Sequence, residues 1–589
     1  MQRYKSTNKI EQLGKVSKSG EQLTQSIADV IDRFRIKSIF KEMDLVKRSG
    51  ILVSTIATGL MILPFVGAAS ILALFKSGLN NPGDGQKDVY YDMKNNPQIN
   101  WRDLLLSIAR QFQYLVGQDI EIIEDAKKTV SQIKAMIFDD SPIEKTGKSI
   151  EGVGYIHDHV KDLYILGFKL LVCGFWDGKS FIPVDFSLHR EKRDSSLKKS
   201  EQRLTKKQLK VKGLEKQKKG LKDQLEEKTK LLKMTESTYG SKPNKTNARK
   251  LEQREKAVGR LETRIEKLSV ELKVQKGQEQ FLKNEYFELK SNYRYCGLKK
   301  ADYENQYQKQ RKKNTAGHKR TKEADVTKID MMIKMLKRSV KKGFVPDYVL
   351  TDTWFFSYKI LQAIIDIGKN IKLVSMARIA NAKYKILPTG KLLTPHEIIT
   401  RYERKNGKNN RKYKARYIQF QAEYQGIRVK IFLIRFGTYG TWRMLVTTDL
   451  NMSFNRIVEV YKIRWTIEVF FKESKQDLLL GKSQSQDFDA QIADITLSLM
   501  RYIFLSYYQR IHYGTTIGGL FRQLSQSAVK ENILAGINLY FVELLQIFAS
   551  LAGVDFITFY EDLLRNPEAE NIINMIGLNS VNKDLLKAA

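Results

Sequence analysis

Three acidic side chains, Asp140, Asp352 and Glu468, are of a type that could support metal-dependent chemistry. Three carboxylates gathered at one point repel one another unless cations neutralise them. Their oxygens are hard ligands, which suit Mg²⁺ and also Mn²⁺. Two such ions about 4 Å apart would activate an attacking oxygen and stabilise the leaving oxygen of a phosphodiester. The acids therefore predict a two-metal site that acts on a nucleic-acid backbone.

Glu468 lies in a segment that predicts a helix with one chemically active face. At about 100° per residue, this face also carries three other polar residues, Tyr461, Arg464 and Lys475. The opposite face holds the apolar residues Ile463, Ile467 and Phe470. One side can thus pack on a core while the other presents an acid among phosphate-binding groups, the guanidinium as a fork and the ammonium as a point charge. The other interpretation is an amphipathic surface helix with an ion pair between Glu468 and Lys472.

The two aspartates each follow a short apolar run that predicts a β-strand. The run from Lys134 ends at Asp140, and Tyr348–Asp352 ends at the second acid. Strand ends in an α/β sheet are where ligand sites usually form. Asp139 precedes Asp140 directly, and strand alternation allows only one of the two to point inward. The residues themselves leave that choice open.

Other segments predict the scaffold around these strands. Tyr164–Phe175 and Phe181–Leu188 are rich in β-forming residues and predict an antiparallel meander with the first strand. Lys, Glu, Leu and Gln dominate residues 192–313, with apolar residues at heptad spacing on both sides of a turn at Tyr239–Asn244. This pattern predicts an antiparallel coiled-coil hairpin inserted into another domain. Its many lysines indicate either DNA or partner contact or a solvated charged face.

The charge of the whole chain limits its partners. The 589 residues carry a formal net charge of +37, spread along the sequence rather than confined to a tail. Nucleic acid is the expected partner, because Lys and Arg contacts to phosphates supply most sequence-independent affinity. Cys173 and Cys296 form no CxxC pair, which fits a reducing compartment and disfavours a disulfide scaffold or zinc site. A cytoplasmic, nucleoid-associated location in a prokaryotic cell is expected.

One apolar segment permits a different interpretation. Ile51–Phe75 has no charged residue and is long enough to span a bilayer. Pro64 and Gly67 favour instead a helical core that is broken in the middle, because a proline inside a helix removes a hydrogen bond. We therefore expect no membrane association, with a membrane anchor as the alternative.

At the residues singled out above, the sequence resembles a known family. Tyr461-x2-Arg464-x3-Glu468-x6-Lys475 is similar to the Y-R-E-K signature of the DDE transposases of the insertion-sequence-4 family. Phe138–Ser141 resembles the first-acid strand of that family and Val349–Phe355 the second. The resemblance covers roughly residues 133–190 and 319–513 and favours Asp140 over Asp139 as the first acid.

The resemblance implies an RNase H-like catalytic core with a β-rich insertion, and the coiled-coil insertion is a departure from the family pattern. Together with the residue patterns above, this predicts an α/β fold in which an inserted antiparallel coiled-coil hairpin and helical N- and C-terminal regions are added to that core. The expected regions are a helical N-terminal DNA-binding domain at 1–130, the core at 131–191 and 314–525, the basic coiled-coil insertion at 192–313, the β-rich insertion at 384–449 and a helical C-terminal region at 526–589. The resemblance also implies cut-and-paste transposition by a homodimer, with transposon-end DNA and target DNA as partners. Family members keep an aromatic residue that stacks a flipped base, and Trp442 is the nearest match, offset by about one residue. The other interpretation of Trp442 is a strand tryptophan in a β-sheet core.

Two further functions stay open from the sequence. An RNase H-like nuclease without strand transfer would use the same acids, whereas a non-enzymatic DNA-binding protein would leave them apart. His157-Asp158-His159 could hold a metal but lacks further spaced ligands, and His189 is more typical of a structural histidine. The sequence has no P-loop, so no nucleotide cofactor is expected.

Overall fold

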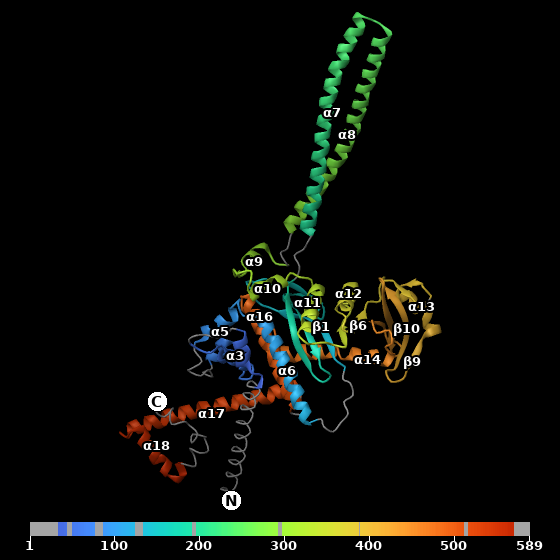
Figure 1. Cartoon of the computed structure of the whole chain (residues 1–589). Helices are drawn as coiled ribbons and strands as arrows, with labels where there is room; N and C mark the ends of the chain where they lie inside the picture. Colours follow the sequence, from blue (N-terminus) through green and yellow to red (C-terminus); the bar gives the residue numbers. More distant parts are fainter. Residues whose placement is uncertain are drawn as a thin grey trace. The chain divides into compact units, whose positions relative to one another are not determined.

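The computed structural model describes residues 33–43, 50–76, 86–123, 133–190, 196–292, 297–387, 389–511 and 516–569 (Figure 1). Cys296 lies outside these residues, as do the first 32 positions of the expected N-terminal domain and the last 20 of the expected C-terminal region. The chain divides into two compact units, Met1–Arg190 with Gln306–Ala589, and Glu191–Asn305.

The smaller unit is a long helix pair, as the heptad pattern predicts. Helix α7 (Ser196–Ser241) and α8 (Lys245–Asn292) are joined by the predicted turn, and α9 (Lys300–Glu304) follows. The side chains of Lys207 and Gln275 bond at one level, and Arg254 bonds the Leu231 carbonyl nearer the turn, so the helices run antiparallel. The seam buries the predicted heptad residues Leu221, Leu261 and Leu268, with Leu214, Leu225 and Ile265 beside them.

The larger unit is built on one mixed sheet. Its described strands follow the order β2-β3-β1-β5-β6-β12-β11-β10-β7-β8, with β4 paired to β3 and β9 to β10. The half that includes the acids consists of β1 (Ala135–Glu144), β2 (Gly154–Asp158), β3 (Leu163–Trp176), β4 (Phe181–His189), β5 (Tyr348–Thr351) and β6 (Lys372–Ala377). Strands β1, β3 and β4 form the predicted antiparallel meander, and β1 runs parallel to β5.

The β-rich segment expected at 384–449 continues this sheet. It contains β7 (Tyr384–Ile386), β8 (Leu392–Leu393), α13 (Pro395–Asn406), β9 (Lys408–Asn410), β10 (Ala415–Tyr424), β11 (Ile427–Phe436) and β12 (Trp442–Thr447). Its β12 pairs antiparallel with β6, so the segment is joined to the core edge to edge.

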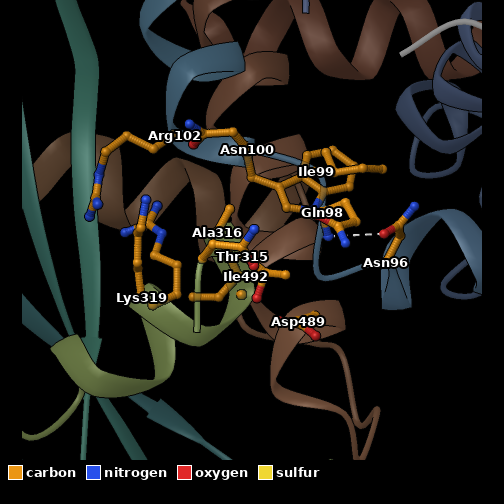
Figure 2. A pocket seen from close by; sticks show the side chains of 14 residues that line it. Asn96, Gln98, Ile99, Asn100, Arg102, Thr315, Ala316, Lys319, Asp489 and Ile492 are labelled. Carbon is orange, nitrogen blue, oxygen red and sulfur yellow. Dashed lines mark hydrogen bonds between the residues drawn. The ribbon is translucent and has the colours of Figure 1, made fainter. Parts of the chain in front are cut away.

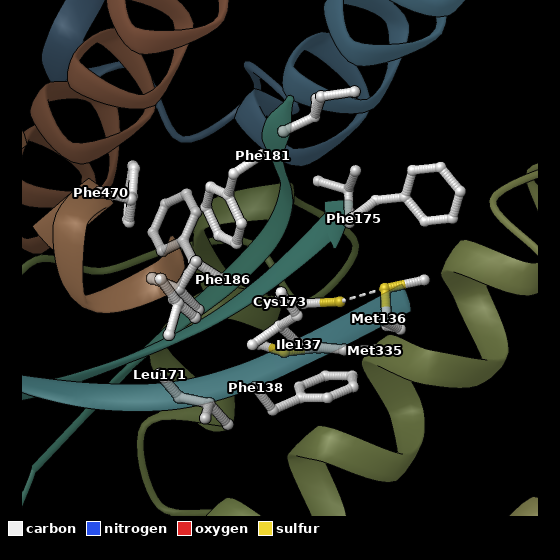
Figure 3. Close-up of a cluster of buried hydrophobic side chains, with 14 of the residues drawn as sticks. Met136, Ile137, Phe138, Leu171, Cys173, Phe175, Phe181, Phe186, Met335 and Phe470 are labelled. Atoms are coloured by element: carbon white, nitrogen blue, oxygen red, sulfur yellow. Dashed lines mark hydrogen bonds between the residues drawn. The ribbon is translucent and has the colours of Figure 1, made fainter. Parts of the chain in front are cut away.

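Helices cover both faces of the core half of the sheet. One side is covered by α11 (Lys328–Lys341), which packs on β3 and β4, with α12 (Tyr358–Ile367) next to it. The other side meets α15 (Trp465–Asp477), which packs on β1 and β4. Figure 3 shows Met335 of α11 and Phe470 of α15 packed with side chains of β1, β3 and β4, among them the buried Cys173. The rings of Phe470 and Phe181 are 5.1 Å apart.

The remaining helices of this unit surround the core. They are α2 (Ile36–Glu42), α3 (Val53–Ile62), α4 (Ile71–Lys76), α5 (Lys87–Asn95), α6 (Trp101–Ile123), α10 (Ala316–Glu323), α14 (Phe454–Lys462), α16 (Phe488–Ile511), α17 (Ile517–Leu551) and α18 (Phe556–Arg565). Most of α16 is buried all round, and α5 and α6 pack against it.

The apolar segment Ile51–Phe75 forms two short helices rather than one long one. Helix α3 ends at Ile62, two residues before Pro64, and Gly67 adopts a φ of 72° before α4 begins. Arg501 of α16 donates to the carbonyls of Leu60 and Met61, which fixes the end of α3 inside the protein. Across the described ranges, no helix is both long and apolar enough to cross a membrane.

Candidate active site

The two aspartates of β1 point to opposite faces of the sheet. They lie in the middle of the strand, which continues beyond them, and not at its end as the sequence suggests. Asp139 faces α15, where Arg464 Nη1 lies 2.9 Å from its Oδ2. Asp140 faces α11, where Lys328 Nζ lies 3.0 Å from its Oδ2. The acid that faces the helix of Glu468 is therefore Asp139, which differs from the sequence-based choice of Asp140.

The next residue on the same face agrees with this orientation. Ser141 follows Asp139 by two positions, and its Oγ accepts a hydrogen bond of 2.7 Å from Lys475 Nζ. Lys475 also donates to the Pro142 carbonyl at 2.9 Å. Burial lowers the pKa of this ammonium. Lys475 thus contacts β1 on the face that Asp139 shares.

Asp352 follows β5 and lies beside Asp139. Strands β1 and β5 are parallel, and their last registered pair is Ile137 with Leu350. Two residues further along each strand, the register brings Asp139 next to Asp352, and parallel partners point to the same face. The Oδ1 of Asp352 accepts the backbone N–H of Trp354 at 3.0 Å. The middle of β1 and the carboxyl end of β5 thus bring two acids together.

The proton affinities of these acids reflect their crowding. Burial raises the pKa of Asp139 to about 7, and the charge of Asp352 adds to this, although Arg464 acts in the opposite direction. Burial also raises the pKa of Asp352, and the charge of Asp140 contributes. Carboxylates in this state gain stability from a nearby cation.

Glu468 reaches the same place from the helical side. Helix α14 ends at Lys462 and α15 begins at Trp465, so the single helix expected over this segment is interrupted at Ile463 and Arg464, whose backbones stay helical. Arg464 Nη2 bonds Glu468 Oε1, while its Nη1 bonds Asp139. The guanidinium therefore joins the acid of the helix to the acid of the strand.

Tyr461 completes the group at the end of α14. Its ring lies 5.8 Å from the Arg464 guanidinium. Burial raises the pKa of its hydroxyl to about 12, so the phenol keeps its proton at neutral pH and can donate it to a phosphate oxygen. Opposite these polar groups, Ile467 and Phe470 are fully buried, as the helical pattern predicts.

The donor set fits a divalent metal, although the side chains do not converge on one point. In the part of the chain that the structure describes, no three His, Cys, Asp or Glu side chains are placed to hold a metal ion together. Asp139, Asp352 and Glu468 offer hard carboxylate oxygens, which suit Mg²⁺ or Mn²⁺. Burial and the charge of Asp352 raise the pKa of Asp139, and the Arg464 guanidinium that bonds this carboxyl acts in the opposite direction.

Trp442 lies at the first position of β12. Its ring is partly buried against the core, and Arg435 on the neighbouring strand lies over it with its guanidinium carbon 5.1 Å from the ring centroid. The base-stacking role that the family resemblance implies for Trp442 stays a prediction.

A separate hollow lies at the start of α6 and α10. It has a volume of about 250 Å³, and Figure 2 shows Arg102, Lys319 and Asp489 among its lining residues. Arg102 forms ion pairs with Asp185 and Glu323. None of the three acids Asp139, Asp352 and Glu468 lines this hollow, so it is distinct from the candidate active site.

Comparison with known proteins identifies a family domain within the larger unit. Residues 315–504 match the family model described as a transposase DDE domain, and no curated protein matches the chain. The matched segment contains Asp352 and Glu468 but not β1. A domain of this family marks a catalytic transposase and implies DNA transposase activity, with transposon DNA as partner. DDE transposases generally use divalent metals. The expected enzyme class is thus confirmed.

Proposed function

We propose that this catalytic transposase is of the insertion-sequence-4 type and cuts and joins DNA at Asp139, Asp352 and Glu468, in an RNase H-like core. Asp139 takes the place that the sequence assigned to Asp140. The observation that carries the proposal is the Arg464 guanidinium, which contacts Asp139 on the strand and Glu468 on the helix. The register of β1 and β5 adds Asp352 to the same face.

The three acids would hold two Mg²⁺ or Mn²⁺ ions. When bound, such ions supply activation of the attacking oxygen and stabilisation of the leaving oxygen in phosphodiester cleavage. The protein's own contribution would be to offer three carboxylates around a partly buried site, where charge interactions are stronger than in water. The alternation of β1 leaves Asp140 to Lys328 on the other face.

The cations around the acids would position the DNA. Arg464 offers a planar fork to a phosphate, Lys475 a point charge, and Tyr461 a protonated hydroxyl. With a net charge of +37, the chain can attract the DNA backbone over a longer range. The reaction is hydrolysis at a transposon end followed by transesterification into target DNA. A homodimer would bring two ends together.

Replacing Glu468 by Gln tests the proposal, with Glu473→Gln on the same helix as the matched control. The substrate is a linear duplex that carries at its ends the DNA flanking the gene, incubated with a target plasmid and Mg²⁺. We expect end cleavage and plasmid insertion from the unmodified protein and from the control, no cleavage from Glu468→Gln, and equal DNA binding by all three. EDTA should abolish both reactions.

Cleavage that survives Glu468→Gln would show that the acid is wrongly assigned. Cleavage without insertion would show a nuclease that lacks strand transfer. DNA binding without cleavage by any variant would indicate a binding protein.

A further inference from the structure

A row of planar side chains lies next to Asp352, on elements that the acid site does not use. Trp354 follows Asp352 by two residues and bonds it through its backbone N–H. The Arg378 guanidinium carbon lies 4.2 Å from the Trp354 ring centroid, and the His159 ring centroid lies 5.1 Å from it at an interplanar angle of 32°. The row thus joins the end of β5, the end of β6 and the turn after β2.

The row continues across the β2–β3 turn. The Nδ1 atoms of His159 and His157 are 3.0 Å apart, and the His157 ring lies 5.0 Å from the ring of Tyr164. His157 Nε2 also lies 3.3 Å from Asp162. Each histidine is therefore held by a neighbour in the row.

Three of these rings, those of Trp354, His159 and Tyr164, are exposed although they are packed against neighbours, whereas His157 is partly buried. Trp354 is 56% exposed with Arg378 and His159 in place, and Tyr164 is 69% exposed. Trp442, by contrast, is partly buried in the core. Side chains that only fill a core do not leave this much ring surface in water, and large exposed aromatic surface marks an interaction site.

We propose that Trp354, with Arg378 and His159 beside it, stacks an unpaired nucleobase of the DNA strand held at the acids. The proposal rests on the proposed function and adds a base-binding surface to the same site. Every base has a π-face, so an exposed indole binds bases of any sequence, and a guanidinium beside it adds attraction for both base and phosphate. Because the backbone of Trp354 is bonded to Asp352, a phosphate at the acids places the attached base within reach of the ring.

The partner is an unpaired nucleotide rather than intact duplex, because a stacked and paired base does not expose its face. The turn of β2 and β3 offers His159, His157 and Tyr164 as further flat surfaces for the bases that follow. The surface differs from the Trp442 expected from the family resemblance, which lies on β12.

Fluorescence anisotropy can test the stacking without requiring cleavage. The probe is a labelled duplex with an unpaired 3′ tail of thymidines, compared with the same duplex whose tail carries abasic nucleotides and hence the same phosphates. The protein is the full chain in EDTA, unmodified or with Trp354→Ala, Trp354→Phe or Tyr114→Ala. Tyr114 is also 56% exposed but lies on α6, and serves as the matched control.

We expect Trp354→Ala to weaken binding of the thymidine tail about fivefold to a hundredfold, the range for one stacked base. Binding of the abasic tail should stay unchanged, which also shows that the variant is folded. Trp354→Phe should restore most of the loss, and Tyr114→Ala should have no effect on either tail.

Equal losses on both tails, or no loss on either, would overturn the proposal, as would a Tyr114→Ala loss equal to that of Trp354→Ala. The anisotropy measurement needs no metal and no cleavage. A failure of the Glu468 experiment would therefore not change the outcome of the stacking test, and the two proposals can fail independently.

Discussion

Asp139→Asn and Asp140→Asn should differ greatly in their effect on DNA cleavage, although the residues are adjacent. Asp139 faces Arg464 and the helix of Glu468, whereas Asp140 pairs with Lys328 on the other face. If Asp139 is a metal ligand, Asp139→Asn should remove a contribution of several kcal/mol to transition-state stabilisation. Since about 1.4 kcal/mol corresponds to a tenfold rate change, cleavage should fall at least about a thousandfold. Asp140→Asn removes a partly exposed ion pair and should cost less than about fivefold.

The same substitution should make the metal-free protein more stable. The pKa of Asp139 is raised from 3.8 to about 7 by burial and by Asp352. A raised pKa means that the folded state favours the protonated acid, so the stabilisation is fully present below pH 3.8 and is lost as the pH rises to 7. At about 1.4 kcal/mol for each unit, the ionised Asp139 costs about 4 kcal/mol above pH 7. Asp139→Asn should recover that amount.

Urea unfolding of the full chain in EDTA measures this gain at pH 8 and again at pH 5, where it should be smaller. Cleavage of the transposon-end duplex in Mg²⁺ measures the activity of the same preparations. A stable and inactive Asp139→Asn beside an active Asp140→Asn would support the assignment. The reverse pattern of activity would refute the face argument for β1, and a less stable Asp139→Asn would refute the charge argument.

Two further predictions concern buried groups away from the acids. His189 donates from Nδ1 to the Val326 carbonyl and accepts the Ser187 hydroxyl at Nε2, and burial lowers its pKa from 6.5 to about 4. Because the pKa of His189 is lowered, its contribution to stability is fully present above pH 6.5 and is lost as the pH falls to 4, by about 3 kcal/mol. Between pH 6.5 and 4, the urea midpoint of His189→Asn should therefore fall less than that of the unmodified protein. Arg501 donates to three buried backbone carbonyls. Arg501→Met should lower the free energy of unfolding by about 3 kcal/mol, and an unchanged urea midpoint would contradict this.

Local patterns made much of the scaffold predictable. Apolar residues at heptad spacing, such as Leu221 and Leu268, can only be buried by a partner helix, and the turn residues between the runs fix that partner as the next one in the chain. The break at Pro64 is also predictable from the segment alone, because the N–H that proline lacks prevents one long helix over Ile51–Phe75.

The choice between Asp139 and Asp140 needed information that the strand alone does not contain. Alternation fixes that the two point to opposite faces, but which face meets α15 depends on packing of segments more than 300 positions away, as for Asp139 and Arg464. The family resemblance favours Asp140 and the faces of β1 favour Asp139, so the identity of the first acid stays a prediction that the two asparagine variants test.

The surroundings of Trp354 are not predictable from the sequence for a similar reason. As a ring after a strand, it is equally typical of a core residue, and only the turn of β2 and β3 that places His159 beside it shows an exposed row. The expected role of Trp442 came from the family pattern and not from its surroundings.

The helix pair between the two aspartate strands has a consequence for how the chain folds. Strands β1 and β5 are parallel neighbours although their paired residues Ala135 and Tyr348 lie far apart in sequence, so the segment between them must form a large closed loop. Helices α7 and α8 have 46 and 48 residues and run antiparallel, so the chain returns to the end of the pair where it entered. Contacts near the turn of such a hairpin are local in sequence and form early, and pairing can extend from there towards the open end. Once it has formed, the loop that remains to be closed is much shorter, and closing it costs less entropy. The inserted α7–α8 pair can thus be accommodated without slowing the pairing of β1 with β5.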